Sequence, residues 1–213
     1  EIHSGDWSSD VCSSDLGARL VSKGVAGQAF QFDGDDCVVL PTLREHLIKN
    51  LGAVSISLWM LNTKTKRFSV CFNLGRAGDT HLGIVCRNLA VALALPDRYG
   101  GGLVEVDRVA PGVWHHVVGV WDGQQKMIYL DGRLRNKQET AEFTLNPSSI
   151  SSEPARIGSL AKEYRRKDKF FHGLIDELAI YPRALTEDEV TTLYKMGVTT
   201  HESAAKNEKS AAN

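Results

Sequence analysis

The sequence lacks any apolar run approaching the roughly 20 residues that a membrane-spanning helix requires. Its first residues show neither the basic start nor the apolar stretch of a signal peptide. It also has little net charge, because 25 Lys and Arg against 26 Asp and Glu leave a formal charge of -1. Since no net field attracts phosphates or anionic lipids, we expect neither nucleic acid nor a membrane as a partner.

Zinc-binding spacings of cysteine and histidine are also missing. None of the four cysteines stands in a Cys-x-x-Cys pair, and no His-Glu-x-x-His segment occurs. The adjacent pair His115-His116 does not change this, because neighbouring residues of a strand point to opposite faces and cannot easily share one ion.

A disulfide between Cys71 and Cys86 is disfavoured by the expected strand register. The register that gathers the apolar side chains on one face pairs Phe72 with Ile84 and Leu74 with Leu82. That register places Val70, not Cys71, opposite Cys86. We therefore expect free thiols.

The two ends of the chain are not assigned to the domain. The segment from Asp6 to Leu16 resembles the translation of a sequencing-library adapter, so residues 1–16 are set aside as artefactual. Residues 198–213 are mainly Ser, Ala, Lys, Glu, Asn and Thr, which bury little, and we expect a disordered tail. Residues 17–197 have the length and apolar content of one domain.

Apolar and polar residues alternate along most of this domain. In 54–60, Val54, Ile56, Leu58 and Met60 share one face, and Ser55, Ser57 and Trp59 share a wet or groove-lining face. Similar runs occupy 68–74, 82–86, 89–95, 114–121, 126–130 and 170–181, with Gly and Asp turns between them. The pattern predicts an all-β fold of two facing antiparallel sheets. Its expected core is Phe30, Phe32, Val54, Ile56, Leu58, Phe72, Leu74, Ile84, Val118, Val120, Ile128, Leu130, Leu174, Leu178 and Ile180.

Helix signals are few. Thr186 and Glu189 have the spacing of a capping box, and Gly197 follows as a helix stop. The segment from Leu43 to Leu51 is either a second short helix or an irregular crossing between sheets.

Three segments in order resemble the laminin-G-like branch of the concanavalin A-like lectin and glucanase fold. They are 29–40, which has an Asp-Gly turn between two strands, 114–132, which looks like a central hairpin, and 170–190, which looks like a closing strand with a terminal helix. The resemblance implies a jelly-roll sandwich, often with a calcium ion and a carbohydrate or protein ligand.

Calcium prefers several hard oxygen ligands, and the resemblance implies that Asp176 meets the first turn of the fold. Asp33, Asp35 and Asp36 cluster in that turn, so these four aspartates are the expected site of a structural Ca²⁺. The alternative is a solvated turn, with Asp176 bonded to nearby backbone amides.

Aromatic rings that stack on a pyranose are the expected ligand contacts, and Trp59, Tyr99 and Tyr164 are the candidates. Trp59 has the alternative of packing beneath a loop. The basic segment 162–169 either meets an acidic polymer or is an ordinary solvated loop.

We therefore expect a non-catalytic recognition module that binds a polysaccharide or other glycan as part of a larger extracellular, cell-surface or periplasmic protein. A protein-binding or adhesion module is the alternative. A retaining glycoside hydrolase would need two close carboxylates, and Glu105 and Asp107 supply only the first half of its usual motif because Ala110 stands at the second glutamate position. A polysaccharide lyase would need a Tyr, His and Arg cluster that spacing neither shows nor excludes.

Overall fold

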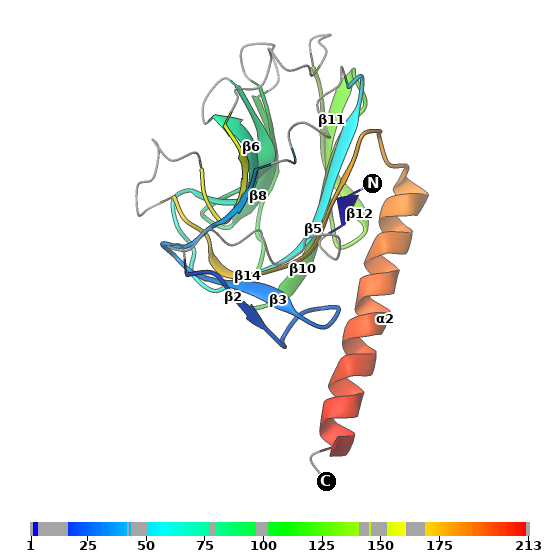
Figure 1. Cartoon of the computed structure of the whole chain (residues 1–213). Helices are drawn as coiled ribbons and strands as arrows, with labels where there is room; N and C mark the ends of the chain where they lie inside the picture. The colour runs from blue at the N-terminus through cyan, green and yellow to red at the C-terminus, as the bar shows by residue number, and fades with distance from the viewer. Residues whose placement is uncertain are drawn as a thin grey trace.

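The computed structural model describes residues 2–3, 17–41, 43, 51–76, 80–96, 102–140, 145, 153–160 and 169–211. Two antiparallel sheets face each other, and one long helix lies against the outside of one of them (Figure 1). The predicted two-sheet sandwich is confirmed. In the described part of the chain, no helix is both long and apolar enough to cross a bilayer.

The first sheet carries the helix on its outer face. The last strand of the domain pairs with one of its first strands, so two segments far apart in the sequence lie side by side. In sheet order its strands are β12 (Arg133–Glu139), β11 (Gln125–Leu130), β10 (Trp114–Trp121), β5 (Val54–Asn62), β14 (His172–Tyr181), β3 (Ala29–Asp33) and β2 (Arg19–Val21), and β1 (Ile2–His3) also pairs with β14.

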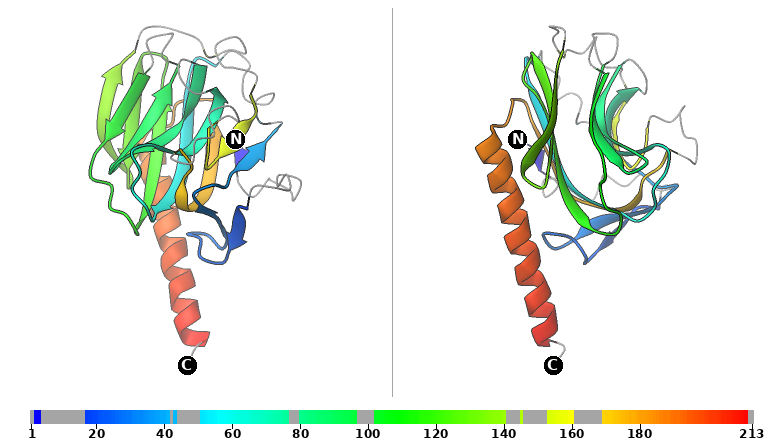
Figure 2. Two further views of the ribbon diagram at one scale, coloured as in Figure 1. Left: turned by 90° about the vertical axis from the view of Figure 1, so that its left-hand side faces the viewer. Right: turned by 180° about the vertical axis from the view of Figure 1, so that it is seen from behind.

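The second sheet is built mainly from consecutive hairpins and stands opposite the first (Figure 2). In sheet order its strands are β4 (Val38–Leu40), β13 (Ala155–Ile157), β6 (Ser69–Arg76), β7 (Thr80–Arg87), β8 (Ala90–Leu95) and β9 (Gly102–Val106).

Each predicted alternating run contains or overlaps a strand. The sequence did not predict β12, whose residues are mostly exposed and include two arginines and a lysine. Charged side chains are typical of an edge strand, because they discourage pairing with another chain. Of the segment 43–51, residues 44–50 lie outside the described residues, and Leu51 forms a single β-bridge with Leu145.

The dry interior lies between the sheets, with Phe32, Phe72, Phe171 and Trp121 among its largest side chains. Most of the predicted core is confirmed, and Phe30 packs against it while partly buried. Val118 and Val120 are exceptions, because they face the helix on the other side of the first sheet. Their neighbours Val117 and Trp121 point inward instead. Between these two, Gly119 leaves room for Leu93, whose Cδ1 would lie 2.7 Å from an added Cβ.

Leu174 is a second exception, and a β-bulge explains it. The pairing of β14 with β5 shifts between Asp176 and Ala179, and Glu177 has a positive φ of 47°. The extra residue shifts the alternation of side chains, so that inward-facing positions are odd-numbered before the bulge and even-numbered after it. Ile175, Leu178 and Ile180 therefore face the interior, whereas Leu174 is only half-buried.

A bulge also places Cys71. The predicted pairs Phe72–Ile84 and Leu74–Leu82 are confirmed, but Ser69 rather than Val70 lies opposite Cys86. Because Cys71 is the extra residue, its side chain enters the core, and its Sγ lies 3.5 Å from Sγ of Cys86. Both are buried free thiols, and burial raises the pKa of the Cys71 thiol well above its usual value.

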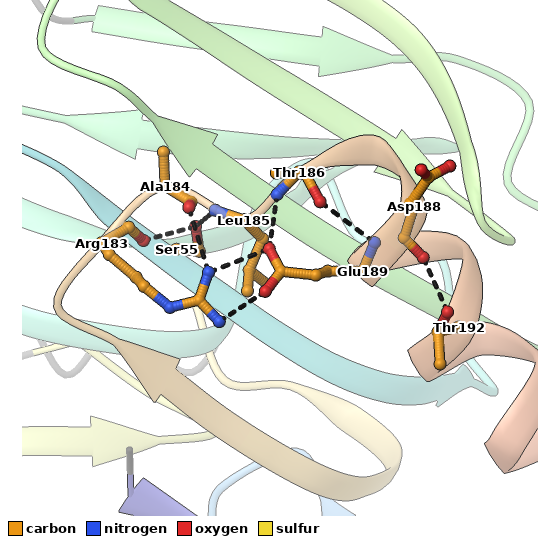
Figure 3. A network of polar contacts seen from close by, with 8 residues as sticks. All are labelled: Ser55, Arg183, Ala184, Leu185, Thr186, Asp188, Glu189 and Thr192. Carbon is orange, nitrogen blue, oxygen red and sulfur yellow. Dashed lines mark hydrogen bonds and ion pairs between the residues drawn. The ribbon is translucent and has the colours of Figure 1, made fainter.

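The helix α2 (Glu187–Ala211) begins at the predicted capping box (Figure 3). The backbone N–H of Thr186 donates to Glu189 Oε2 at 2.8 Å, and the N–H of Glu189 donates to Thr186 Oγ1 at 3.3 Å. Arg183 holds the same carboxylate through two bonds of 2.9 and 2.7 Å, and these bonds lower the pKa of Glu189 to about 2. The Ser55 hydroxyl joins this turn to β5, because it donates to the carbonyl of Arg183 and accepts from the N–H of Leu185.

The helix stop predicted at Gly197 is wrong, since α2 continues to Ala211. Residues 198–211, which were expected in a disordered tail, are therefore helical. Its last turns extend past the strands of the domain (Figures 1 and 2). Gly197 serves close packing instead. A Cβ on Gly197 would lie 2.5 Å from Cζ2 of Trp59, so only glycine lets the helix approach this ring.

We expect Gly197→Ala to lower the free energy of unfolding by about 1–3 kcal/mol through overpacking against Trp59. A loss of stability would distinguish overpacking from helix propensity, because alanine stabilises an unobstructed helix by about 1 kcal/mol relative to glycine. Urea denaturation would measure the change, with Lys195→Ala at an exposed position of α2 as the control. A variant more stable than the wild type would contradict this packing.

Candidate functional site

The face of β5 that the sequence assigned to solvent or to a groove is covered by α2. Trp59 is only 5% exposed. Its ring stacks on Tyr194 of α2, with centroids 5.7 Å apart, and lies 5.1 Å from the ring of His116. The wet face predicted for β5 is wrong, and Trp59 lies in a helix–sheet interface. The other two predicted ligand contacts, Tyr99 and Tyr164, lie outside the described residues.

A cavity of about 160 Å³ lies at this interface, beside Trp59, His116 and Ser57. His116 Nε2 is 2.9 Å from the Ser57 hydroxyl, and its buried Nδ1 has no hydrogen-bond partner among the described residues. Burial lowers the pKa of His116 to about 4, although Asp131 opposes the shift. The imidazole is therefore neutral near pH 7.

His116 makes folding stability depend on pH. Because its pKa is lower in the folded chain than in the unfolded chain, its contribution is complete above about pH 6.5 and is lost as the pH falls toward 4. We expect a loss of about 3 kcal/mol from pH 7 to pH 4, by the rule of about 1.4 kcal/mol per pKa unit.

The expected result is that His116→Gln removes most of this dependence, whereas His201→Gln, at an exposed position of α2, keeps it. Denaturant titrations at several pH values would measure both. Equal pH profiles for His116→Gln and the wild type would show that this side chain does not titrate in the fold as described.

The acidic turn after β3 brings three of the four predicted metal ligands together. Carboxylate oxygens of Asp33, Asp35 and Asp36 all lie within 4.8 Å of one another. Asp36 Oδ2 accepts the backbone N–H of Asp33 at 2.9 Å. The hydrogen bond from Asp35 lowers the pKa of Asp33, whereas burial raises that of Asp36.

Asp176 does not join this turn. His172 pairs with Asp33 at one end of β14, and Asp176 lies four residues further on, roughly 13 Å away at about 3.3 Å per residue. Its carboxylate accepts the backbone N–H groups of Ala26 at 3.1 Å and Glu177 at 2.9 Å. Burial raises its pKa, while these bonds oppose the shift. Asp176 therefore binds backbone amides, as in the alternative that the sequence left open.

The donor chemistry of the acidic turn fits a hard cation, because three carboxylates converge beside a small pocket that Gln31 also lines. The guanidinium of Arg19 lines the same pocket and opposes a cation there. Calcium stays a prediction, and its expected ligands are now Asp33, Asp35 and Asp36. An ion there would hold the end of β3 to the turn that precedes β4.

If calcium binds, a concentration 100 times its Kd would stabilise the fold by about 2.7 kcal/mol, which raises the melting midpoint by about 5–10 °C for a domain of this size. Asp36→Asn should remove the increase and Asp176→Asn should keep it. Thermal melts with calcium and with chelator would measure the difference. Equal melting midpoints of the wild type with calcium and with chelator would show that the acidic turn does not bind calcium.

A larger hollow lies at one end of the second sheet, with a volume of about 770 Å³. Four separate segments meet there: the chain before β6, the hairpin between β7 and β8, the end of β9, and the chain before β14. We call it the edge groove. Its lining residues are Arg67, Phe68, Arg87, Asn88, Leu89, Ala90, Glu105, Asp107, Arg108 and Lys169.

Backbone contacts hold the turns of the edge groove. The N–H of Asn88 donates to the carbonyl of Lys66 at 2.8 Å, and the N–H of Val109 donates to that of Leu89 at 2.7 Å. Asn88 and Arg108 have positive φ values of 55° and 65°. Asparagine adopts this region readily in a hairpin turn, whereas it is uncommon for arginine. Such conformations persist where the surroundings enforce them, often at binding sites.

The side chains of the edge groove are mostly polar. Arg87 and Glu105 form an ion pair at 3.3 Å, and the Lys169 ammonium lies 4.5 Å above the ring of Phe68. Leu89, 47% exposed, supplies an apolar surface. Glu105 and Asp107 both line the groove, but Ala110 leaves the hydrolase motif without its second glutamate.

Sequence reasoning did not identify the edge groove as a site. It noted Glu105 and Asp107 only for an enzyme motif, and Lys169 only as the end of a basic segment. No local spacing connects these residues to Arg67 or Asn88, because strand pairing alone brings them together.

Comparison with known proteins agrees with this architecture. The chain matches the profile of the laminin G family described as the concanavalin A-like lectin/glucanases superfamily, over residues 32–191. It matches no curated protein.

Several solved structures share the fold. Domain 4 of AbnA, a GH43 extracellular arabinanase from Geobacillus stearothermophilus, in complex with arabinotriose, has a TM-score of 0.65 at 20% identity over 86% of this chain and 84% of that chain. The CBM40 of the Ruminococcus gnavus IT-sialidase, bound to α2,3-sialyllactose, has a TM-score of 0.58 at 18% identity over 83% and 96%. NanB sialidase from Streptococcus pneumoniae has a TM-score of 0.65 at 17% identity over 80% of this chain, which spans only 28% of NanB.

The family match covers most of the chain, and the two antiparallel sheets are consistent with it. The chain belongs to the laminin G family of the concanavalin A-like lectin/glucanases superfamily.

Proposed function

We propose that this domain is a non-catalytic recognition module that binds carbohydrate in the edge groove. The observation that carries the proposal is the convergence there of guanidinium, amide and carboxylate side chains around the exposed apolar surface of Leu89. A sugar offers hydroxyls for hydrogen bonds and a C–H face for apolar contact. Small-ligand sites combine apolar surface with a few placed polar groups, and the edge groove does so with a larger polar share.

The relatives of known structure support a carbohydrate ligand without identifying it. The arabinanase domain was solved with arabinotriose and the sialidase CBM40 with sialyllactose, and both have the fold of this chain. The sialidase NanB contains such a fold as part of a longer chain. We propose the same setting here, a module within a larger protein that acts outside the cell.

A protein ligand is the second candidate for the same fold. The binding domain of botulinum neurotoxin serotype G has a TM-score of 0.66 at 12% identity over 89% of this chain. On the chain itself, α2 presents exposed Met196, 62% accessible, next to turns that extend beyond the strands. Binding through α2 and binding through the edge groove would respond to different substitutions.

A glycan array followed by calorimetry tests the proposal. We expect the wild type to bind at least one glycan, and Arg108→Ala to weaken that binding by about 10–100-fold, because a hydrogen bond to a charged group contributes about 1.5–3 kcal/mol. Lys195→Ala, which removes a positive charge from α2, is the matched control and should bind like the wild type.

Unchanged melting midpoints would show that both variants fold. A glycan that binds equally to Arg108→Ala and to the wild type would show that the binding site does not lie in the edge groove. Release of shorter sugars from a bound glycan would show that the module is an enzyme, with Glu105 and Asp107 as the first residues to substitute.

A further inference from the structure

We infer that the glycan recognised by the edge groove is negatively charged and carries a carboxylate or sulfate group on the ring that enters the groove. This inference rests on the proposed function and concerns the same site. It follows from the charge that the groove collects and from the way its turns present that charge.

The edge groove concentrates positive charge in a chain that has almost none overall. Four basic side chains line it against two acidic ones, whereas the whole chain has a formal charge of -1. The basic residues are Arg67, Arg87, Arg108 and Lys169. They come from four different segments, so the cluster is a product of the fold and not of a basic stretch of sequence.

The two acidic residues, Glu105 and Asp107, reduce this charge but leave the lining with a formal charge of +2, since four basic residues face two acidic ones. Glu105 pairs with Arg87, but both side chains are more than 40% exposed, so water and salt screen the pair and it contributes little to stability. The anionic group of a ligand can therefore replace Glu105 at Arg87 or bind beside this ion pair. Within the described part of the chain, Arg67 and Arg108 have no ion-pair partner, and Lys169 lies over the ring of Phe68.

Arg108 is the best placed of these residues to bind an anion directly. It follows β9 with a positive φ, and the backbone N–H of the next residue, Val109, donates to the carbonyl of Leu89. A fixed turn reduces the backbone entropy that is lost when a ligand binds. The planar guanidinium can donate two parallel hydrogen bonds to a carboxylate or a sulfate, which an ammonium cannot do.

The remaining surface suits a sugar and not a bare ion. At about 770 Å³ the groove is within the range of roughly 300–1,000 Å³ that is usual for small-molecule sites. Leu89 and Asn88 adjoin the basic side chains, so the charged substituent and the ring that bears it can be bound together.

The test is an array of matched pairs, in which each neutral oligosaccharide stands beside its uronate, sialylated and sulfated counterparts. The full chain, Arg108→Glu, Arg108→Lys and the α2 control Lys195→Glu would be compared at 50 and 300 mM salt. We expect the charged member of at least one pair to bind ten-fold or more tightly than the neutral member. Arg108→Glu should abolish this preference, Arg108→Lys should retain only part of it, and Lys195→Glu should not alter it.

Preference for the uronate or sialylated glycans would identify a carboxylate as the recognised group, and preference for the sulfated glycans would identify a sulfate. Neutral members that bind as well as their charged counterparts, or binding that is insensitive to salt and to Arg108→Glu, would overturn the inference while the proposed carbohydrate function stands. No binding to any glycan on the array would overturn both.

Discussion

The apolar layer between the two sheets is the interaction on which the rest of the structure depends. Phe32, Ile56, Phe72 and Trp121 meet there from both sheets, and each is almost completely buried. Burial of this layer fixes which face of every strand points inward, and therefore which turns emerge at each end. The edge groove exists because β6, β7 and β9 are held in one register against the first sheet.

The outer face of the first sheet is covered in a second, smaller apolar layer. Val118, Val120 and Tyr181 pack there against Val190 of α2, and Trp59 stacks on Tyr194. The close approach at Gly197 allows the helix to lie flat on the strands. The chain's own helix occupies this face, so among the described residues the large polar hollow lies elsewhere, at one end of the second sheet.

Two of the register shifts in the described sheets change which side chains are buried, at places where regular alternation would give a different result. The bulge at Glu177 turns Ile175 and Leu178 to the core and keeps the Asp176 carboxylate against the backbone near Ala26. The bulge at Cys71 brings two thiols together inside the core. Both bulges lie in strands whose sequence reads as unbroken, so each alters the set of buried residues without leaving a turn signal.

The sequence by itself determined most of the long strands, the pairing of Phe72 with Ile84, most of the core and the start of α2, because these depend on side-chain period and on contacts between near neighbours. It also marked the acidic turn, where three aspartates lie within four residues. Only the tertiary structure decided that Trp59 is covered, that Asp176 is separate from the acidic turn, and that Arg67, Asn88, Arg108 and Lys169 line one groove. Those outcomes depend on bulges, on docking of the helix and on pairing between distant strands, which no local spacing encodes.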